Sequence, residues 1–197
     1  MRRFKFQSLR TVNSRIDFAA SCCAAPSLSA RNFAANRCKG EMTMGIALTL
    51  QEYLNDSHIA YDVTSHTKTD CSAKTAEVSH VPADQLAKGV IVKWDDFYVL
   101  AVLPASRRLD MNRIQKVIGE PVTLASEQEA SMLFPDCKTG AVPVLGSAYK
   151  IASIVDRRLD DQDEVYFEGG DHRCLVHVNG DQFDHLMYGI PHARLSA

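Results

Sequence analysis

The amino-acid sequence predicts one α+β domain, in which helices surround a central mixed and mostly antiparallel β-sheet. Three observations favour this class. The chain has 197 residues, 46% hydrophobic and 23% charged, which suffices for one core, and no second domain is expected. Two apolar runs with strand character follow one another directly, as in a hairpin. The remaining strands and helices show no regular alternation of the kind that builds parallel sheets.

The first 41 residues differ in composition from the rest. They contain eight Lys or Arg and two acidic residues, a local charge of +6, so the other 156 residues carry −8 within a net charge of −2. Two interpretations stay open: an organelle transit peptide, or upstream sequence translated from an early start, with Met42 or Met44 the true start. Both leave residues 1–43 as an unstructured extension and assign residues 44–197 to the domain.

Charge and cysteine content limit the environment and the partners. Binding to duplex DNA usually requires many Lys and Arg contacts with the phosphates. Because the domain is acidic, no DNA partner is expected. No run reaches the roughly 18 apolar residues of a membrane span. The six cysteines form no CxxC pair, which is typical of reduced thiols. We expect a cytoplasmic protein, or an imported one if residues 1–41 are a transit segment.

The first half of the domain is expected to end in a hairpin. Thr49 caps a first helix, residues 59–63 form a half-buried strand, and short helices follow over 72–80 and 82–89. Residues 89–94 and 97–103 then form two strands, and the polar pair between them predicts the turn.

In the second half, the helix termini carry the clearest patterns. Asp110 opens a helix that Gly119 closes, and Ser126 with Glu129 forms a capping box. Strands are expected over 150–156, 164–170 and 174–178, and a final helix over 182–189, capped by Asp181 and ended by Gly189.

Several catalytic motifs are absent from the sequence. It contains no GxGxxG, GxxxxGK[ST], GxSxG or HExxH, so dinucleotide-binding, P-loop, α/β-hydrolase and zincin chemistry lose their main support. His172 and Cys174 are expected on one face of a strand and His177 on the other, which argues against a shared metal. Cys137 is interpreted as a buried thiol. We therefore expect neither a metal nor a cofactor.

Two other features are compatible with catalysis or with ordinary structure. Lys88, at the expected entry to a strand, could stabilise an oxyanion or hold a phosphate, or it could be an exposed helix-end lysine. In "DCKTGAVPVLG", residues 136–146, Gly140 and Pro143 could turn the amides of Gly140, Ala141 and Val142 to one side, or could form a surface turn. His66 and His172 are ambiguous in the same way, as pocket residues or turn histidines.

Five segments in one order resemble the YbaK/aminoacyl-tRNA synthetase-associated family, which includes free-standing relatives of the prolyl-tRNA synthetase editing domain. They are "SH" (65–66), "HVPADQLAKGVIVK" (80–93), "FYVLAVLPASRRLD" (97–110), "LASEQEASMLFPDCKTGAVPVLG" (124–146) and "VYFEGGDHRCLVHV" (165–178). The resemblance covers residues 46–190. It implies a YbaK-like fold and a metal-free deacylase that acts in trans on the ester of a mischarged tRNA.

The resemblance also assigns roles. The family's conserved lysine falls on Lys88, its glycine- and proline-containing loop on Thr139–Pro143, and a late histidine on His172. Many members have two adjacent glycines in this loop, where this chain has Thr139 before Gly140, which is expected to narrow the pocket or alter the side chain it admits.

We therefore expect an aminoacyl-tRNA deacylase. Lys88 would anchor the substrate, the amides of residues 140–142 would form the oxyanion hole, and His66, Thr139, Pro143 and His172 would line the pocket. The expected partners are the acceptor end of the tRNA, contacted by Arg107, Arg108 and Arg113, and an aminoacyl-tRNA synthetase. The alternatives are a non-catalytic binding or regulatory module with the same fold and, less favoured, a small-ester or amidohydrolase.

Overall fold

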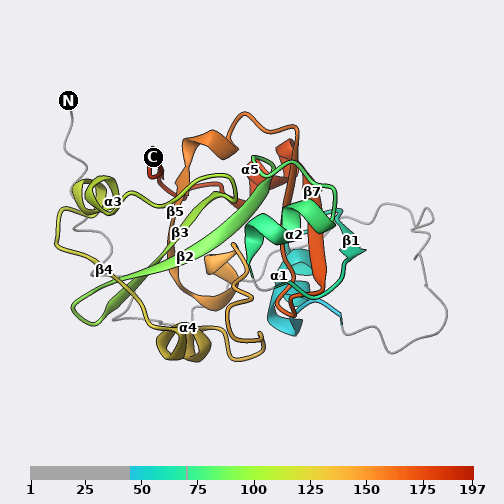
Figure 1. Cartoon of the computed structure of the whole chain (residues 1–197), viewed down its shortest axis with the longest axis horizontal. Helices are drawn as coiled ribbons and strands as arrows, with labels where there is room; N and C mark the ends of the chain where they lie inside the picture. Colours follow the sequence, from blue (N-terminus) through green and yellow to red (C-terminus); the bar gives the residue numbers. More distant parts are fainter. Residues whose placement is uncertain (1–44, 70) are drawn as a thin grey trace, which may run out of the picture. The chain divides into compact units, whose positions relative to one another are not determined.

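The structure, a computed structural model, describes residues 45–69 and 71–197 of the chain. The predictions for residues 1–43 lie outside this part and stay predictions. Figure 1 shows strands surrounded by short helices, none of which, within the described part, is long and apolar enough to cross a membrane. The helices are α1 (Leu48–Asp56), α2 (Ser72–Val78), α3 (Met111–Ile118), α4 (Glu127–Leu133) and α5 (Gly180–Leu186), with 3-10 turns η2 (Gly146–Tyr149) and η3 (Arg157–Leu159).

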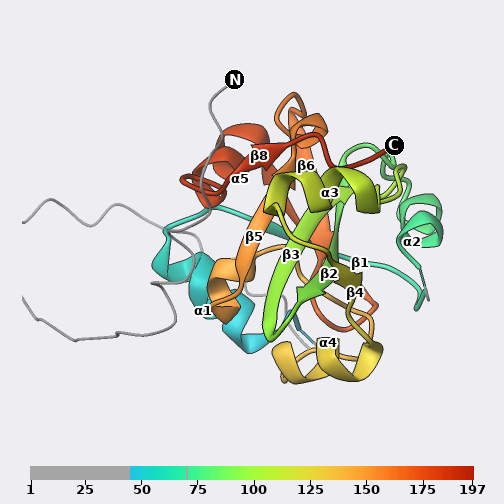
Figure 2. The same cartoon turned by 90° about the vertical axis from the view of Figure 1, so that its left-hand side faces the viewer.

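The strands form one mixed sheet, as predicted. They are β1 (Asp62–Ser65), β2 (Leu86–Trp94), β3 (Phe97–Pro104), β4 (Thr123–Leu124), β5 (Ala152–Asp156), β6 (Glu164–Glu168), β7 (Cys174–Asn179) and β8 (His192–Ala193). Their order is β1-β7-β6-β2-β3-β5-β8, and β4 pairs with β2. The β2–β3 hairpin is antiparallel, whereas β6 joins β2, and β5 joins β3, in parallel. Figure 2 shows β2, β3 and β5 side by side.

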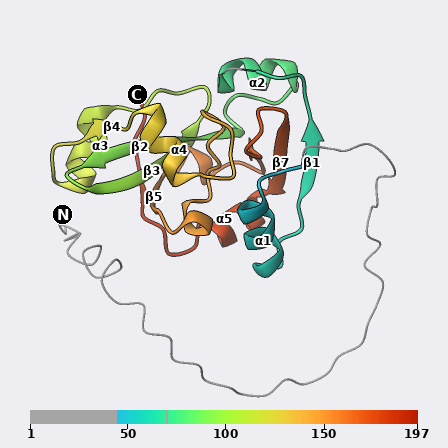
Figure 3. The same ribbon diagram turned by 90° about the horizontal axis from the view of Figure 1, so that it is seen from below.

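Successive side chains of a strand point to opposite faces of the sheet, so both faces carry apolar side chains, and helices cover both. The larger core cluster contains Leu50 of α1, Phe183 of α5 and Ala87 of β2. A smaller cluster on the other side contains Ala76 of α2 and Leu86 of β2. Figure 3 shows α1 and α5 on one side of the strands and α2 on the other. Fully burying a side chain such as Phe183 stabilises the fold by about 1.5–3 kcal/mol.

The hairpin and three helix termini were predicted correctly. β2 and β3 pair up to Trp94 and Phe97, directly beside the expected turn. The Asp110 side chain accepts hydrogen bonds from the first amides of α3, and Gly119 ends that helix with φ of +88°. The Ser126 capping box on α4 is present.

Several local predictions are wrong, and in the first two cases a contact distant in sequence satisfies the backbone. Residues 82–85 form only a turn, since pairing with β3 already begins at Ala87. α1 begins at Leu48, and the Thr49 amide donates to the distant Asp136 carboxylate at 2.9 Å. Asn179, not Asp181, caps α5.

Candidate functional site

A cavity of about 520 Å³ lies beside the first residues of β2. This volume is within the usual range for small-molecule sites. Its wall is assembled from α2, β2, the segment after β3, the 140–142 loop and the turn between β6 and β7. Four of the predicted site residues line it: Lys88, Gly140, Val142 and His172.

Lys88 lies inside β2 and not at the end of a helix, which corrects the local structure expected around it. Its ammonium group donates to the carbonyl oxygen of Ala105 at 3.2 Å. Among the described residues, no carboxylate lies within ion-pair distance of it. Burial and, to a smaller extent, the charge of Arg108 lower the pKa of Lys88. The cavity therefore contains a partly desolvated cation that has no counter-ion among residues 45–69 and 71–197.

Two glycines allow the 139–143 loop to lie against β2. A Cβ at Gly89 would come within 2.8 Å of the Leu100 side chain and 3.0 Å of the Val142 side chain, so these side chains would have to shift to admit it beside Lys88. Gly140 has φ of +86°, a conformation that residues with a Cβ adopt at a cost. The sequence indicated flexibility at Gly140, and the structure shows that a specific conformation requires it.

Fewer of the backbone amides of residues 140–142 are available as hydrogen-bond donors than the sequence predicted. The Ala141 amide donates to the Lys138 carbonyl at 2.9 Å and its side chain is fully buried, so Ala141 is removed from the cluster. The amides of Gly140 and Val142 donate to no acceptor within the described part of the chain. Two donors beside the cavity remain available for an oxyanion.

Thr139 and Pro143 do not line the cavity. The Thr139 hydroxyl accepts a hydrogen bond from Ser131 of α4 at 3.3 Å, and Pro143 is buried beneath the loop. The structure therefore gives no support to the expectation that Thr139 narrows the pocket.

His172 lies in the turn before β7, with φ of +62°, and not on a strand as expected. Its Nε2 is 2.8 Å from the carbonyl oxygen of Thr139. Because a carbonyl only accepts, Nε2 carries the proton and donates. The ring thus fixes the loop residue that precedes Gly140, and it also lines the cavity.

Glu168, the last residue of β6, is a cavity residue that sequence reasoning missed. Its Oε1 accepts the His172 amide proton at 2.9 Å. Burial is the largest of several influences and raises the pKa of Glu168. Its position directly before Gly169 and Gly170 was the available indication.

His66 and Cys137 lie outside the cavity wall. The His66 Nδ1 lies 2.7 Å from the Thr67 carbonyl, and its Nε2 is buried without a partner among the described residues. Burial raises the pKa of Cys137 to about 11, so this thiol is protonated at neutral pH and is a poor nucleophile.

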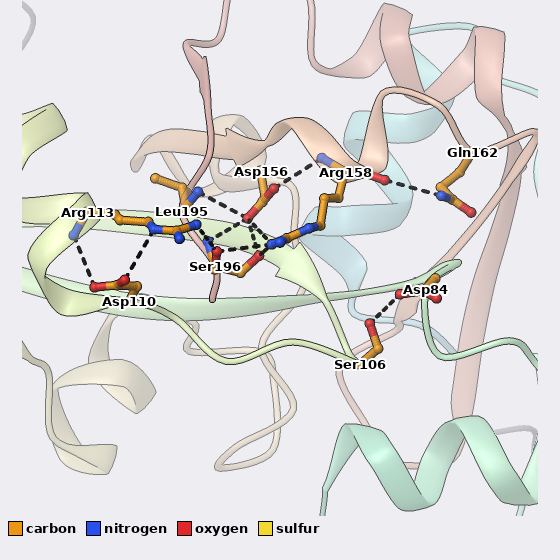
Figure 4. A network of polar contacts seen from close by, with 9 residues as sticks. All are labelled: Asp84, Ser106, Asp110, Arg113, Asp156, Arg158, Gln162, Leu195 and Ser196. Atoms are coloured by element: carbon orange, nitrogen blue, oxygen red, sulfur yellow. Dashed lines mark hydrogen bonds and ion pairs between the residues drawn. The ribbon is translucent and has the colours of Figure 1, made fainter.

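The expected basic patch divides into two parts. Arg107 and Arg108 line the cavity, whereas Arg113 forms an ion pair with Asp110 at 3.2 Å and donates to the Ser196 carbonyl. Arg113 lies beside a network of polar contacts that Figure 4 shows. We call this network the Asp156 clamp, and it consists of Asp156, Arg158, Leu195 and Ser196. Only the first part is positioned to contact a ligand in the cavity.

No group of three or more His, Cys, Asp or Glu side chains in the described part of the chain is arranged to hold a metal ion. His177 instead contacts the carboxylates of Glu164 at 2.5 Å and Asp62 at 3.6 Å.

The chain belongs to the aminoacyl-tRNA editing domain family, whose model matches residues 66–186. Its fold is similar to that of the hypothetical protein APE2540, at 24% identity, a TM-score of 0.68, and coverage of 76% of this chain and 99% of the other. It is also similar to a protein described as a candidate trans-editing enzyme for prolyl-tRNA synthetase, at 22% identity, a TM-score of 0.67, and coverage of 77% and 96%.

A third similar structure belongs to a longer protein. It is described as a candidate signal transduction protein from Marinobacter aquaeolei VT8, with 20% identity and a TM-score of 0.62. The match covers 76% of this chain and 30% of that one. Comparison with curated protein sequences gives no match.

Proposed function

We propose that this protein is a trans-acting deacylase that hydrolyses the ester bond of mischarged aminoacyl-tRNA. The observation that carries the proposal is the meeting of Lys88, two available loop amides and the His172–Glu168 pair at one cavity. Membership of the editing-domain family supports the same reaction. The proposed location is the cytoplasm, as expected from the cysteine content.

The chemistry needs no protein nucleophile, because an aminoacyl ester is already activated. Water adds to the carbonyl carbon, and the amides of Gly140 and Val142 stabilise the oxyanion that forms. The carbon–oxygen bond to the ribose then breaks, and the proton lost by the water ends on the ribose oxygen. The products are a free amino acid and tRNA.

The cations of the cavity suit the nucleic-acid end of this substrate. Lys88 has no carboxylate partner in the described part of the chain. It is proposed to hold the terminal phosphate or ribose, together with Arg107 and Arg108, which also line the cavity. Such contacts position the ester against the loop amides, and positioning alone contributes strongly to rate. The rest of the domain is acidic, so contact is expected to stay at the acceptor end.

The test is a panel of mischarged tRNAs incubated with the full chain. We expect at least one ester to be hydrolysed, and Lys88→Ala to slow that reaction by roughly 100-fold or more. Lys93→Ala is the matched control, because Lys93 lies on the same strand but pairs with Glu129 outside the cavity. If no tRNA in the panel shows Lys88-dependent ester loss, the proposal is wrong.

A second candidate is a binding or regulatory module that keeps the fold without turnover. The observation that favours it is the same fold within a longer protein described as a candidate signal transduction protein. A module of this kind would bind a non-hydrolysable aminoacyl-adenosine amide but would leave every mischarged tRNA intact.

A further inference from the structure

Lys88 and Glu168 occupy neighbouring positions on adjacent parallel strands. β2 and β6 pair in register at Leu86 with Tyr166 and at Ala87 with Phe167. Lys88 and Glu168 each follow their paired residue by one position, and both line the cavity. Two opposite charges are thus placed near each other on the same wall.

These two charges nevertheless do not form an ion pair in the described structure. Lys88 donates to the Ala105 carbonyl, and Glu168 accepts from the His172 amide through Oε1 alone. The ionisable groups that act most on Glu168 are His172, His66 and Asp171, not a lysine or arginine. Its second carboxylate oxygen therefore has no donor among the described residues, although burial makes a cationic partner favourable.

Glu168 is also close to the loop that would hold the reacting carbonyl. Its Oε1 accepts the amide proton of His172, and the ring of His172 donates to Thr139, the residue before Gly140. In an aminoacyl ester, the carbon that bears the α-ammonium group is bonded directly to the reacting carbonyl carbon. An ammonium site must therefore lie near the oxyanion donors, and Glu168 lines the same cavity and is connected to their loop through His172.

Glu168 is the carboxylate among the described residues that line the cavity, whose other charged side chains are Lys88, Arg107 and Arg108. This distribution complements the aminoacylated 3′-terminal nucleotide of a tRNA, which has an α-ammonium group on the amino acid and a phosphate on the ribose. We propose that Glu168 binds the α-ammonium group, so that the protein selects aminoacyl esters with a free α-amino group. This inference rests on the proposed deacylase function.

The main alternative role for Glu168 is that of a general base for the attacking water. A base would serve every ester that enters the cavity, whether or not its amino group is free. An ammonium site would instead distinguish a free amine from an acylated one, because acylation removes the charge and adds bulk. The two roles therefore differ in which substrate is affected by the loss of Glu168.

The experiment uses the mischarged tRNA that the full-length protein hydrolyses fastest, together with the same tRNA after acetylation of the α-amino group. We expect kcat/KM of the unmodified protein to fall about 30-fold or more on acetylation. Glu168→Gln keeps the acceptor for the His172 amide. It should slow the free-amine substrate by about the same factor and leave the acetylated one unchanged.

Glu164→Gln is the matched control, since Glu164 lies on the same strand but contacts His177 outside the cavity. Equal thermal unfolding of Glu168→Gln and the unmodified protein excludes misfolding as the cause. Equal hydrolysis of both substrates by the unmodified protein, or equal slowing of both by Glu168→Gln, overturns the assignment while the deacylase function stands. Failure to hydrolyse any tRNA overturns both.

Discussion

The cavity and the Asp156 clamp are both rich in charged side chains, but they use them differently. In the clamp, one oxygen of the fully buried Asp156 accepts hydrogen bonds from the Leu195 amide, the Ser196 amide and the Ser196 hydroxyl. In the cavity, the described structure gives the Lys88 ammonium group one carbonyl partner and the Glu168 carboxylate one amide partner.

The difference shows why charge alone does not identify a site. Buried charges in a folded protein are normally paired or hydrogen-bonded, because desolvation is costly. The charged side chains of the clamp are paired or hydrogen-bonded within the chain, and these contacts help to hold residues 195–197 in place. The charged side chains of the cavity are only partly paired or hydrogen-bonded, so a ligand can supply the partners that they lack. The comparison can be tested through the free energy of unfolding.

The largest expected effect is on the clamp. Asp156→Ala leaves the amides of Leu195 and Ser196 without their acceptor and Arg158 without its carboxylate partner, so we expect a loss of about 3–5 kcal/mol in urea-induced unfolding. Asp160→Ala is the control, because Asp160 pairs with His192 at the surface and should cost about 1 kcal/mol or less. Equal losses for the two variants would contradict the distinction.

A smaller effect is expected from a side chain at Gly140. Its φ is +86° and that of Gly119 is +88°, so alanine at either position should cost about 1–2 kcal/mol. An added Cβ at Gly140 lies 3.5 Å from the His172 ring, whereas nothing lies within 4 Å at Gly119.

The two glycine variants therefore separate the effect of backbone strain on stability from the effect of the Gly140 loop position on activity. Gly140→Ala should reduce ester hydrolysis by roughly tenfold or more, and Gly119→Ala should not change it. Activity measured at a temperature where both variants are fully folded decides the point. A comparable loss in both would show that strain, and not the loop position, controls the rate.

Glu129 gives an effect that depends on pH. Its hydrogen bond with Lys93, followed by bonds from the Ser126 amide and Tyr98, lowers its pKa from about 4.5 to about 2. A pKa depressed by folding stabilises the protein above about 4.5, and this contribution disappears as the pH falls toward 2. Glu129→Gln should therefore destabilise the protein at neutral pH and have no effect near pH 2. A difference that persists at pH 2 would refute this.

The smallest expected change in stability is at Lys88. Lys88→Met removes a partly desolvated cation that forms no ion pair in the described structure and replaces it with an apolar chain of similar length. Urea-induced unfolding should show no loss of stability, although ester hydrolysis should be nearly abolished. A clear loss of stability would mean that Lys88 is a structural residue like those of the clamp.

Local elements were predicted well because their causes are local. The β2–β3 turn, the Asp110 cap and the Ser126 capping box each depend on a few adjacent residues. The helix expected over 82–89 failed because pairing with β3 overrides local preference there.

The candidate site was predicted in part for the same reason. Composition and family resemblance indicated Lys88, Gly140 and His172. Glu168 required knowledge of the β2–β6 pairing, which joins segments far apart in sequence. The exclusion of Ala141 required knowledge that its amide bonds to Lys138. Neither contact has a periodic pattern in the sequence.

The segment that carries Arg107 and Arg108 is held by residues from the far end of the described chain. The Ala197 amide donates to the Arg108 carbonyl, and Ser196 forms a β-bridge with Leu109. During synthesis, β2, β3 and the 139–143 loop leave the ribosome long before this segment acquires those contacts. Arg107 and Arg108 therefore take their final position in the fold only after residues 195–197 have been synthesised.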